Sequence, residues 1–220
     1  MQIWPAGAVF AVDGGQAGMF PQSMTQSALP RRRRLWNLPN LLTYGRVVAV
    51  PLVVGFLLYP NVHWMRWAAF WIFAAAGVSD FFDGYLARIW QQQSSLGRML
   101  DPIADKLLVA ASLLALAFGG AFGVWSIWAA VIILCREILV SGLREFLAEL
   151  RVSVPVSWIA KWKTTAQILA LGFLITGPAG ETVLPGTIMI GLTLLWVAAV
   201  LTLYTGWDYM RSSFKHVADE

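Results

Sequence analysis

Six apolar stretches follow one another along this chain of 220 residues, and each is long enough to cross a lipid bilayer. A helix needs about 20 apolar residues to cross the hydrocarbon core. Hydrophobic residues make up 58% of the sequence, which excludes an ordinary soluble domain. The sequence therefore predicts an all-α integral membrane protein, a compact bundle of six transmembrane helices with antiparallel neighbours. The predicted helices are Leu41–Tyr59, Trp64–Ala87, Asp101–Ala121, Val124–Leu150, Trp158–Thr176 and Leu184–Met210.

Basic residues lie at alternate ends of these helices and predict how the chain crosses the membrane. The formal net charge is +4. Clusters such as Arg31–Arg34 and Lys161–Lys163 flank one set of helix ends, and the connections at the other ends carry no Lys or Arg except Arg66. By the positive-inside rule, both termini are cytoplasmic. The positive charge indicates contact with anionic lipid headgroups, and no nucleic acid is expected as a partner.

The two ends of the chain differ in composition from the apolar part. Residues 1–30 are predicted to form a loosely ordered tail, within which Met24 is an alternative start. The membrane domain is expected to cover residues 31–212, followed by a tail over 213–220. Arg31–Trp36 is interpreted as a basic topology signal with an aromatic anchor, or as a short interfacial helix on the anionic leaflet. Pro39 suits the entry to the first helix, and Asn40 is predicted to cap it.

Four carboxylates within 26 residues are the main candidate for a functional site. Asp80 and Asp83 are spaced i and i+3 near the end of the second predicted helix. Asp101 and Asp105 are spaced i and i+4 in the third, where Asp101 followed by Pro102 indicates a helix start. A helical hairpin would therefore place the two carboxylate pairs opposite each other. Charged groups at membrane depth are costly, and four such acids would repel one another without cations between them.

The chemistry of this cluster indicates divalent cations and a phosphate-containing substrate. Mg2+ and Mn2+ prefer oxygen ligands, and two such ions would balance four carboxylates and still attract a pyrophosphate. Gly84 allows a substrate to approach the backbone, and the planar guanidinium of Arg88 suits phosphate. The alternative interpretation is that the acids form membrane-edge salt bridges with Arg88, Arg98, Lys106 and Arg136.

The run Asp80-x2-Asp-Gly-x2-Ala-Arg-x8-Gly-x3-Asp-x3-Asp105 resembles the signature of the CDP-alcohol phosphotransferases in every fixed position. Three further segments resemble the bacterial phosphatidylglycerophosphate synthases of that family. They are Asn37–Arg46, Arg136–Arg144 and Lys161–Gln167. The resemblance extends from about Leu35 to Met210, and it implies a bacterial-type inner membrane location with a cytoplasmic active site.

This resemblance implies a substrate and a role for each matching residue. The substrate would be CDP-diacylglycerol, with its pyrophosphate held by two divalent ions, Mg2+ or Mn2+. Asp80, Asp83 and Asp101 would be metal ligands, and Asp105 would bind the second metal and accept the proton of the attacking hydroxyl. The residues implied to contact the nucleotide or its phosphates are Asn40, Thr43, Gly84, Arg88 and Ser94.

A second group of charged residues follows the signature and suggests the acceptor substrate. Arg136 lies deeper in the fourth predicted helix than a topology signal requires, about two turns before Arg144. Together with Lys163, these cations are predicted to bind the phosphate of glycerol 3-phosphate. Glu137 is expected to orient Arg136 or to pair with it.

Two alternative functions remain open at this stage. A sibling enzyme would use the same nucleotide site with another acceptor, as in cardiolipin or phosphatidylinositol phosphate synthesis. A divalent cation transporter would instead use the acids as a permeation site, although they cluster near one membrane face. By analogy with the family, a homodimer is also expected.

Overall fold

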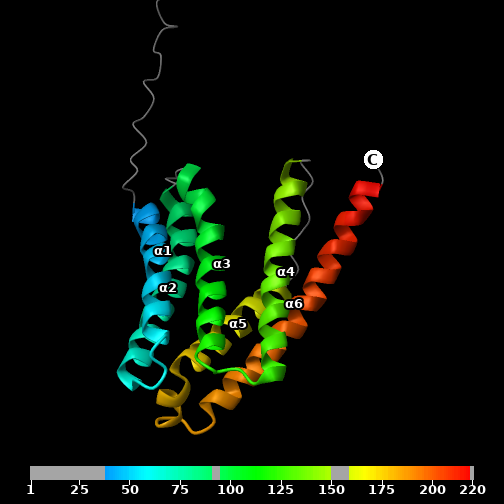
Figure 1. Cartoon of the computed structure of the whole chain (residues 1–220). Helices are drawn as coiled ribbons and strands as arrows, with labels where there is room; N and C mark the ends of the chain where they lie inside the picture. Colours follow the sequence, from blue (N-terminus) through cyan, green and yellow to red (C-terminus); the bar gives the residue numbers. More distant parts are fainter. Residues whose placement is uncertain (1–37, 91–94, 150–158, 219–220) are drawn as a thin grey trace, which may run out of the picture. The chain divides into compact units, whose positions relative to one another are not determined.

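The computed structural model describes residues 38–90, 95–149 and 159–218, and the side chains of residues 80–98 are among those outside the description. The regular secondary structure in these ranges is helical (Figure 1). The helices are α1 (Leu38–Leu57), α2 (His63–Trp90), α3 (Ser95–Phe118), α4 (Val124–Glu149), α5 (Ile159–Glu181) and α6 (Thr187–Ala218). Each overlaps one predicted helix. The predicted interfacial helix at 31–36 lies outside the described residues.

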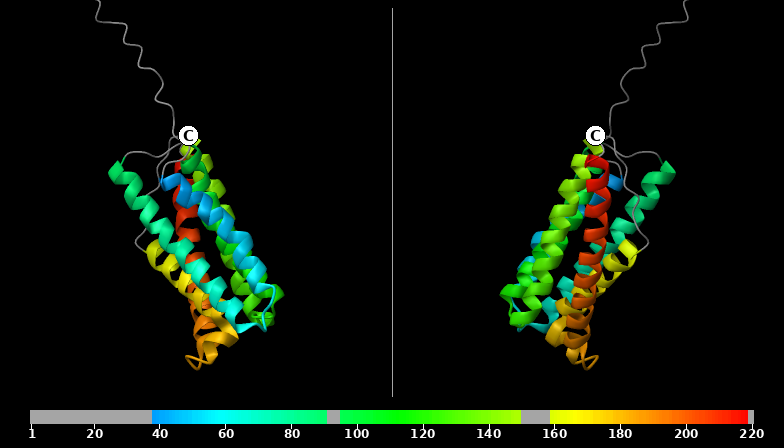
Figure 2. Two further views of the ribbon diagram at one scale, coloured as in Figure 1. Left: turned by 90° about the vertical axis from the view of Figure 1, so that its left-hand side faces the viewer. Right: turned by 90° about the vertical axis from the view of Figure 1, so that its right-hand side faces the viewer.

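Consecutive helices run in opposite directions, as predicted (Figure 1). α1 packs against α2 and α3, while α5 packs chiefly against α6 and also against α2. α4 packs mainly against α6 and touches α3 only slightly, although α3 and α4 are consecutive. Two side views show α5 running obliquely between α2 and α6 (Figure 2). α3 and α4 are therefore held together mainly through the other helices of the bundle.

The two predicted helix caps, at Asp101 and Asn40, are wrong. α3 begins at Ser95, so Asp101 and Pro102 lie inside the helix, where Pro102 removes one backbone donor without ending it. The Asp101 carboxylate instead accepts a hydrogen bond from Thr43 of α1. α1 begins at Leu38, so Asn40 lies in the first turn and not at the cap. α6 continues to Ala218, past its predicted end at Met210.

The packed interior lies between the helices and consists mainly of leucine, isoleucine and alanine. Leu113 and Leu116 of α3, Ile133 of α4 and Leu195 of α6 are at most 1% exposed. Large apolar side chains also remain on the outside, including Trp125, Trp128 and Ile138 of α4. A lipid environment accommodates such an apolar outer surface, whereas water penalises it.

Within the described residues, two segments are apolar and long enough to cross a membrane, judged by length and composition. They are Val124–Ala148 in α4 and Thr187–Arg211 in α6. The apolar segment Leu41–Leu57 in α1 is shorter. The acidic motif at one end of α2 and α3 reduces their apolar length, because ionisable residues carry a large transfer cost.

Arg66, the basic residue that departs from the charge asymmetry, has a structural role at a kink in α5. Gly177 has a φ of 44° and interrupts the helical geometry just before Pro178. Pro178 has no N–H to donate to the Leu174 carbonyl four residues earlier. The Arg66 Nη1 donates to the carbonyl oxygens of Leu174 at 3.2 Å and Ile175 at 3.1 Å. The buried guanidinium therefore satisfies carbonyls at a break in the helix, which explains a cation at this end of the bundle.

Candidate active site

Two hydrogen-bonded contacts join the acids of α3 to α1. The Thr43 Oγ1 donates to the Asp101 Oδ1 at 2.5 Å. One turn further along both helices, the Arg46 Nη1 donates to the Asp105 Oδ1 at 2.8 Å. The spacings of i and i+3 on α1 and i and i+4 on α3 place these pairs on facing sides of the two helices. Asp101 and Asp105 are thus held in place by contacts between α1 and α3.

Arg46 is a residue whose importance the sequence reasoning missed. The sequence predicts for it no more than a place in the segment Asn37–Arg46, which resembles the phosphatidylglycerophosphate synthases. In the structure its side chain is 0% exposed, while the side chain of its partner Asp105 is 45% exposed. The available signal was a cation eight residues inside an apolar helix, since a charge at that depth usually has a partner.

Several predicted site residues cannot be positioned at the level of side chains. Asp80, Asp83, Gly84 and Arg88 belong to α2, and Asn40 belongs to α1. Their side chains lie outside the part of the chain that the structure describes, and Ser94 lies outside it entirely. Among described residues, no three His, Cys, Asp or Glu side chains form a metal-binding group. The roles of these residues therefore stay predictions.

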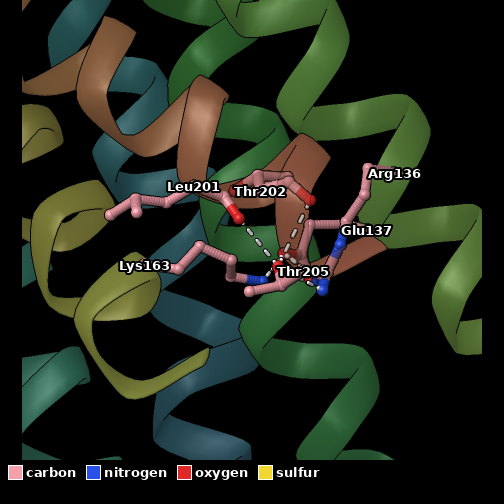
Figure 3. Close-up of polar contacts among 6 residues, drawn as sticks. All are labelled: Arg136, Glu137, Lys163, Leu201, Thr202 and Thr205. Carbon is pink, nitrogen blue, oxygen red and sulfur yellow. Dashed lines mark hydrogen bonds and ion pairs between the residues drawn. The ribbon is translucent and has the colours of Figure 1, made fainter. Parts of the chain in front are cut away.

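The cations predicted for the acceptor lie together around one carboxylate. The Glu137 Oε1 accepts hydrogen bonds from the Lys163 Nζ of α5 and from the Arg136 Nη1 at 3.3 Å (Figure 3). The Arg136 Nη2 also donates to the Thr205 Oγ1 of α6 at 2.9 Å. Lys163 is buried, with 6% of its surface exposed. The prediction that Glu137 pairs with Arg136 is confirmed, and the structure adds Lys163 and Thr205 to that contact.

A cavity of about 670 Å³ connects this cluster to the acidic motif. Asp105 of α3 lines it, together with Arg136 and Arg144 of α4 and Lys163 of α5. The structure thus brings together one predicted catalytic acid and all three predicted acceptor cations. Other polar residues also line the cavity. The sequence predicts a role for none of Ser141, Glu145, Thr164 and Gln167, and it predicts Lys106 only as a possible salt-bridge partner of the acids.

The charges around this cavity suit an anionic, hydroxyl-bearing substrate. Glu137 shares one oxygen between two cations, so the trio with Arg136 and Lys163 retains a formal positive charge. Arg144, in the same cavity, adds another. Guanidinium and ammonium groups bind phosphate by charge-assisted hydrogen bonds. The Asp105 carboxylate at the α3 wall is a hydrogen-bond acceptor for a hydroxyl group.

Comparison with known proteins identifies the class to which this arrangement belongs. The family model described as CDP-alcohol phosphatidyltransferase matches residues 36–204. The chain therefore belongs to the CDP-alcohol phosphatidyltransferase family, whose members are membrane-embedded, and the chain is an all-helical membrane protein.

Individual relatives share a more specific name. A protein of Cereibacter sphaeroides is 39% identical over 218 residues, covering 84% of this chain and 99% of the relative. A protein of Rickettsia bellii is 44% identical, covering 82% of this chain and 97% of the relative. A protein of Shigella flexneri serotype 5b is 42% identical, covering 84% and 99%. Each is named CDP-diacylglycerol--glycerol-3-phosphate 3-phosphatidyltransferase.

Proposed function

We propose that this protein transfers the phosphatidyl group of CDP-diacylglycerol to glycerol 3-phosphate in phospholipid biosynthesis. The products are phosphatidylglycerol phosphate and CMP. The observation that carries this proposal is a single cavity lined both by Asp105 and by Arg136, Arg144 and Lys163. The named relatives over most of the chain support the same reaction.

The residues described at the cavity suit the two ends of glycerol 3-phosphate. Arg136, Arg144 and Lys163 hold the phosphate, and Glu137 keeps two of these cations in place. Asp105 receives the hydroxyl at the other end. The hydroxyl oxygen then bonds to the phosphorus that carries the diacylglycerol, the bond from that phosphorus to CMP breaks, and Asp105 takes the proton.

The acidic motif also fits divalent metal ions. Asp101 and Asp105 are hard oxygen donors one turn apart, and contacts with Thr43 and Arg46 hold both of them. With Asp80 and Asp83 they are proposed to hold Mg2+ or Mn2+, with two ions expected. When bound, such ions neutralise phosphate charge in the transition state. Asn40, Thr43, Gly84, Arg88 and Ser94 are proposed to contact the nucleotide half of the lipid substrate.

The location of the site follows from the helix ends. All six helices are proposed to cross a bacterial-type inner membrane, with both termini and the active site cytoplasmic. The starts of α1 and α3 and the ends of α2, α4 and α6 lie at one end of the bundle (Figure 1). Arg144 lies within the last two turns of α4 and so toward that end, which the positive-inside rule assigns to the cytoplasm. A homodimer is proposed by family analogy.

An assay of the purified protein tests the reaction directly. The protein is mixed with CDP-diacylglycerol, Mg2+ and one acceptor, and CMP release is measured. We expect release with glycerol 3-phosphate and its loss in excess chelator. Faster release with phosphatidylglycerol, inositol phosphate or serine would assign a sibling reaction instead. Divalent cation flux into liposomes without CDP-lipid, and no CMP release, would favour a transporter.

A further inference from the structure

Arg136 lines the cavity but also contacts α6. The described residues that line the cavity come from α3, α4 and α5, and none comes from α6. Thr205 nevertheless accepts a hydrogen bond from the Arg136 Nη2 at 2.9 Å, and Thr205 itself is buried. The other terminal nitrogen of the same guanidinium, Nη1, donates to the Glu137 Oε1 at 3.3 Å. The guanidinium is therefore held by two contacts, one to Glu137, which lines the cavity, and one to Thr205 of α6, which does not (Figure 3).

The hydroxyl of Thr205 is oriented by its own helix. Its Oγ1 donates to the Leu201 carbonyl oxygen at 2.9 Å and approaches the Thr202 carbonyl oxygen at 3.2 Å. A hydroxyl has one donor and two acceptor lone pairs. Because its proton is directed to the α6 backbone, the oxygen presents a lone pair to the Arg136 N–H.

Gly206 makes room for the aliphatic part of the same arginine. A Cβ atom at position 206 would lie 2.9 Å from the Arg136 Cγ and 3.2 Å from its Nε. Contacts this short force a neighbour to move, so alanine would displace Arg136 from α6. Thr205 and Gly206 together form what we call the Arg136 support.

We infer that the Arg136 support consists of positioning residues that set the guanidinium for the phosphate of the acceptor. This inference rests on the proposed function, because it identifies Arg136 as a phosphate ligand of glycerol 3-phosphate. A displacement of about 1 Å in a positioning group can cost on the order of a hundredfold in rate. The support therefore contributes to selection of a phosphorylated acceptor without touching it.

The test uses Thr205→Val, which keeps the shape of the side chain but removes the hydroxyl, and Gly206→Ala. Binding of radiolabelled glycerol 3-phosphate by equilibrium dialysis accompanies measurement of KM for each substrate. We expect both variants to weaken glycerol 3-phosphate binding and raise its KM about tenfold, with the KM for CDP-diacylglycerol within about twofold of wild type. Thr205→Ser, which restores the hydroxyl, should return the KM for glycerol 3-phosphate to near the wild-type value.

Two control variants on α6 separate positioning from a general loss of structure. Thr202→Val removes a buried hydroxyl that has no hydrogen-bond partner among the described residues. Gly191→Ala introduces a Cβ that would lie 2.8 Å from the Leu174 Cγ. It therefore causes a steric clash on α6 at a site that does not contact Arg136. Both controls should leave the ratio of the two KM values unchanged, and melting temperatures should be measured for all variants.

The possible outcomes distinguish this inference from the proposed function. Unchanged glycerol 3-phosphate binding in Thr205→Val would overturn the role of the Arg136 support. The same conclusion would follow if Thr205→Val changed the KM values for both substrates equally, as a general structural defect in Gly191→Ala would. A Thr205→Ser variant as weak as Thr205→Val would also overturn it. Wild-type protein that binds no glycerol 3-phosphate and releases no CMP with it would overturn the proposed function, and this inference with it.

Discussion

Arg46 and Arg136 illustrate how single charged residues are accommodated in this chain. Both are arginines within apolar helices, and each donates to a carboxylate on the cavity wall, Asp105 for Arg46 and Glu137 for Arg136. A charge removed from water is costly unless it is paired and hydrogen-bonded. Each pair therefore has at least one member on the cavity wall. The Arg46–Asp105 pair depends on packing between α1 and α3, whereas Arg136 and Glu137 are neighbours in α4.

Asp105→Asn tests the proton-accepting role at the residue scale. Asparagine keeps the size of the side chain and an oxygen that accepts from Arg46, so the fold should be retained. It lacks the negative charge needed to take a proton. A general base contributes about 10²- to 10⁴-fold, so kcat for CMP release should fall by at least about a hundredfold. The control is Asp208→Asn, which changes an exposed acid on α6 and should leave kcat unchanged. A kcat for Asp105→Asn within about tenfold of wild type would contradict the proton-accepting role of Asp105.

Arg144→Ala and Lys163→Ala test the acceptor site. Each substitution removes a charge-assisted hydrogen bond to phosphate, worth roughly 1.5–3 kcal/mol, so KM for glycerol 3-phosphate should rise about ten- to a hundredfold. The KM for CDP-diacylglycerol should change less. Steady-state kinetics with each substrate varied in turn gives both values. If only the KM for the lipid substrate rises, the acceptor site has been assigned to the wrong cavity.

At the scale of elements, α5 combines a kink with a buried cation from another helix. The kink arises at Gly177, whose φ of 44° is accessible to glycine, and Pro178 prevents a regular continuation. Arg66 of α2 reaches across to the carbonyl oxygens exposed by this break. The contact ties α2 to α5 near one end of the bundle, at the opposite end from the acidic motif (Figure 1).

Arg66→Met should destabilise the protein through this contact. Methionine retains much of the side-chain volume but donates no hydrogen bond, so the Leu174 and Ile175 carbonyls lose a partner. An unsatisfied buried polar group costs roughly 1–3 kcal/mol, and the melting temperature in detergent should fall clearly below that of wild type. Arg211→Met, which changes an exposed arginine of α6, should have little effect. Equal melting temperatures for the two variants would exclude the proposed role of Arg66.

The connection between α5 and α6 predicts a dependence of stability on pH. The Glu181 Oε2 accepts from the Gly186 N–H at 2.7 Å, and the Oε1 accepts from the Ile188 N–H at 2.9 Å. These bonds to Ile188 and Gly186 lower the pKa of Glu181 from its usual value of 4.5. Because the pKa of Glu181 is lower in the folded protein, the ionised carboxylate stabilises the folded state at pH values above 4.5. This stabilisation is lost as the pH falls through the lowered pKa.

Glu181→Gln isolates this effect in thermal unfolding curves recorded across pH. At neutral pH the wild type should melt at a higher temperature than the variant, because glutamine accepts fewer and weaker hydrogen bonds from the two N–H groups. The difference should shrink as pH falls below the usual glutamate range. A difference that stays constant down to the lowest pH would show that the carboxylate charge does not contribute.

At the scale of the whole molecule, the two ends of the bundle differ in charge. The end with the α3–α4–α5 cavity carries Asp101, Asp105 and the cations around Glu137. At the other end, the described connections carry few charged residues, and the nearby Arg66 is buried. This asymmetry supports the proposal that the chemistry takes place at one membrane surface, where a water-soluble acceptor and a lipid substrate can meet.

Cysteine labelling in intact cells tests this orientation. Asn61→Cys and Arg211→Cys place single thiols at exposed positions of opposite ends, each in a Cys135→Ser background. A membrane-impermeant maleimide should label position 61 from the periplasmic side and position 211 only after the membrane is opened. Labelling in the reverse pattern would invert the proposed topology and move the active site out of the cytoplasm.

The sequence by itself determined the helical class, the approximate position of each helix and the family. Long apolar segments leave a chain in lipid little alternative to helices, because the backbone must satisfy its own hydrogen bonds. The spacing of Asp101 and Asp105 on a helix likewise fixes that they share a face. The motif from Asp80 to Asp105 is local, and it could therefore be recognised without a fold.

Only the tertiary structure decided which distant residues meet. Arg46 pairs with Asp105 across 59 positions, and Arg136 reaches Thr205 across 69. The sequence could not show that Arg66 completes a broken helix, because this depends on how α2 packs against α5. Local periodicity assigns each residue to a face of its own helix, but packing between helices determines what that face contacts.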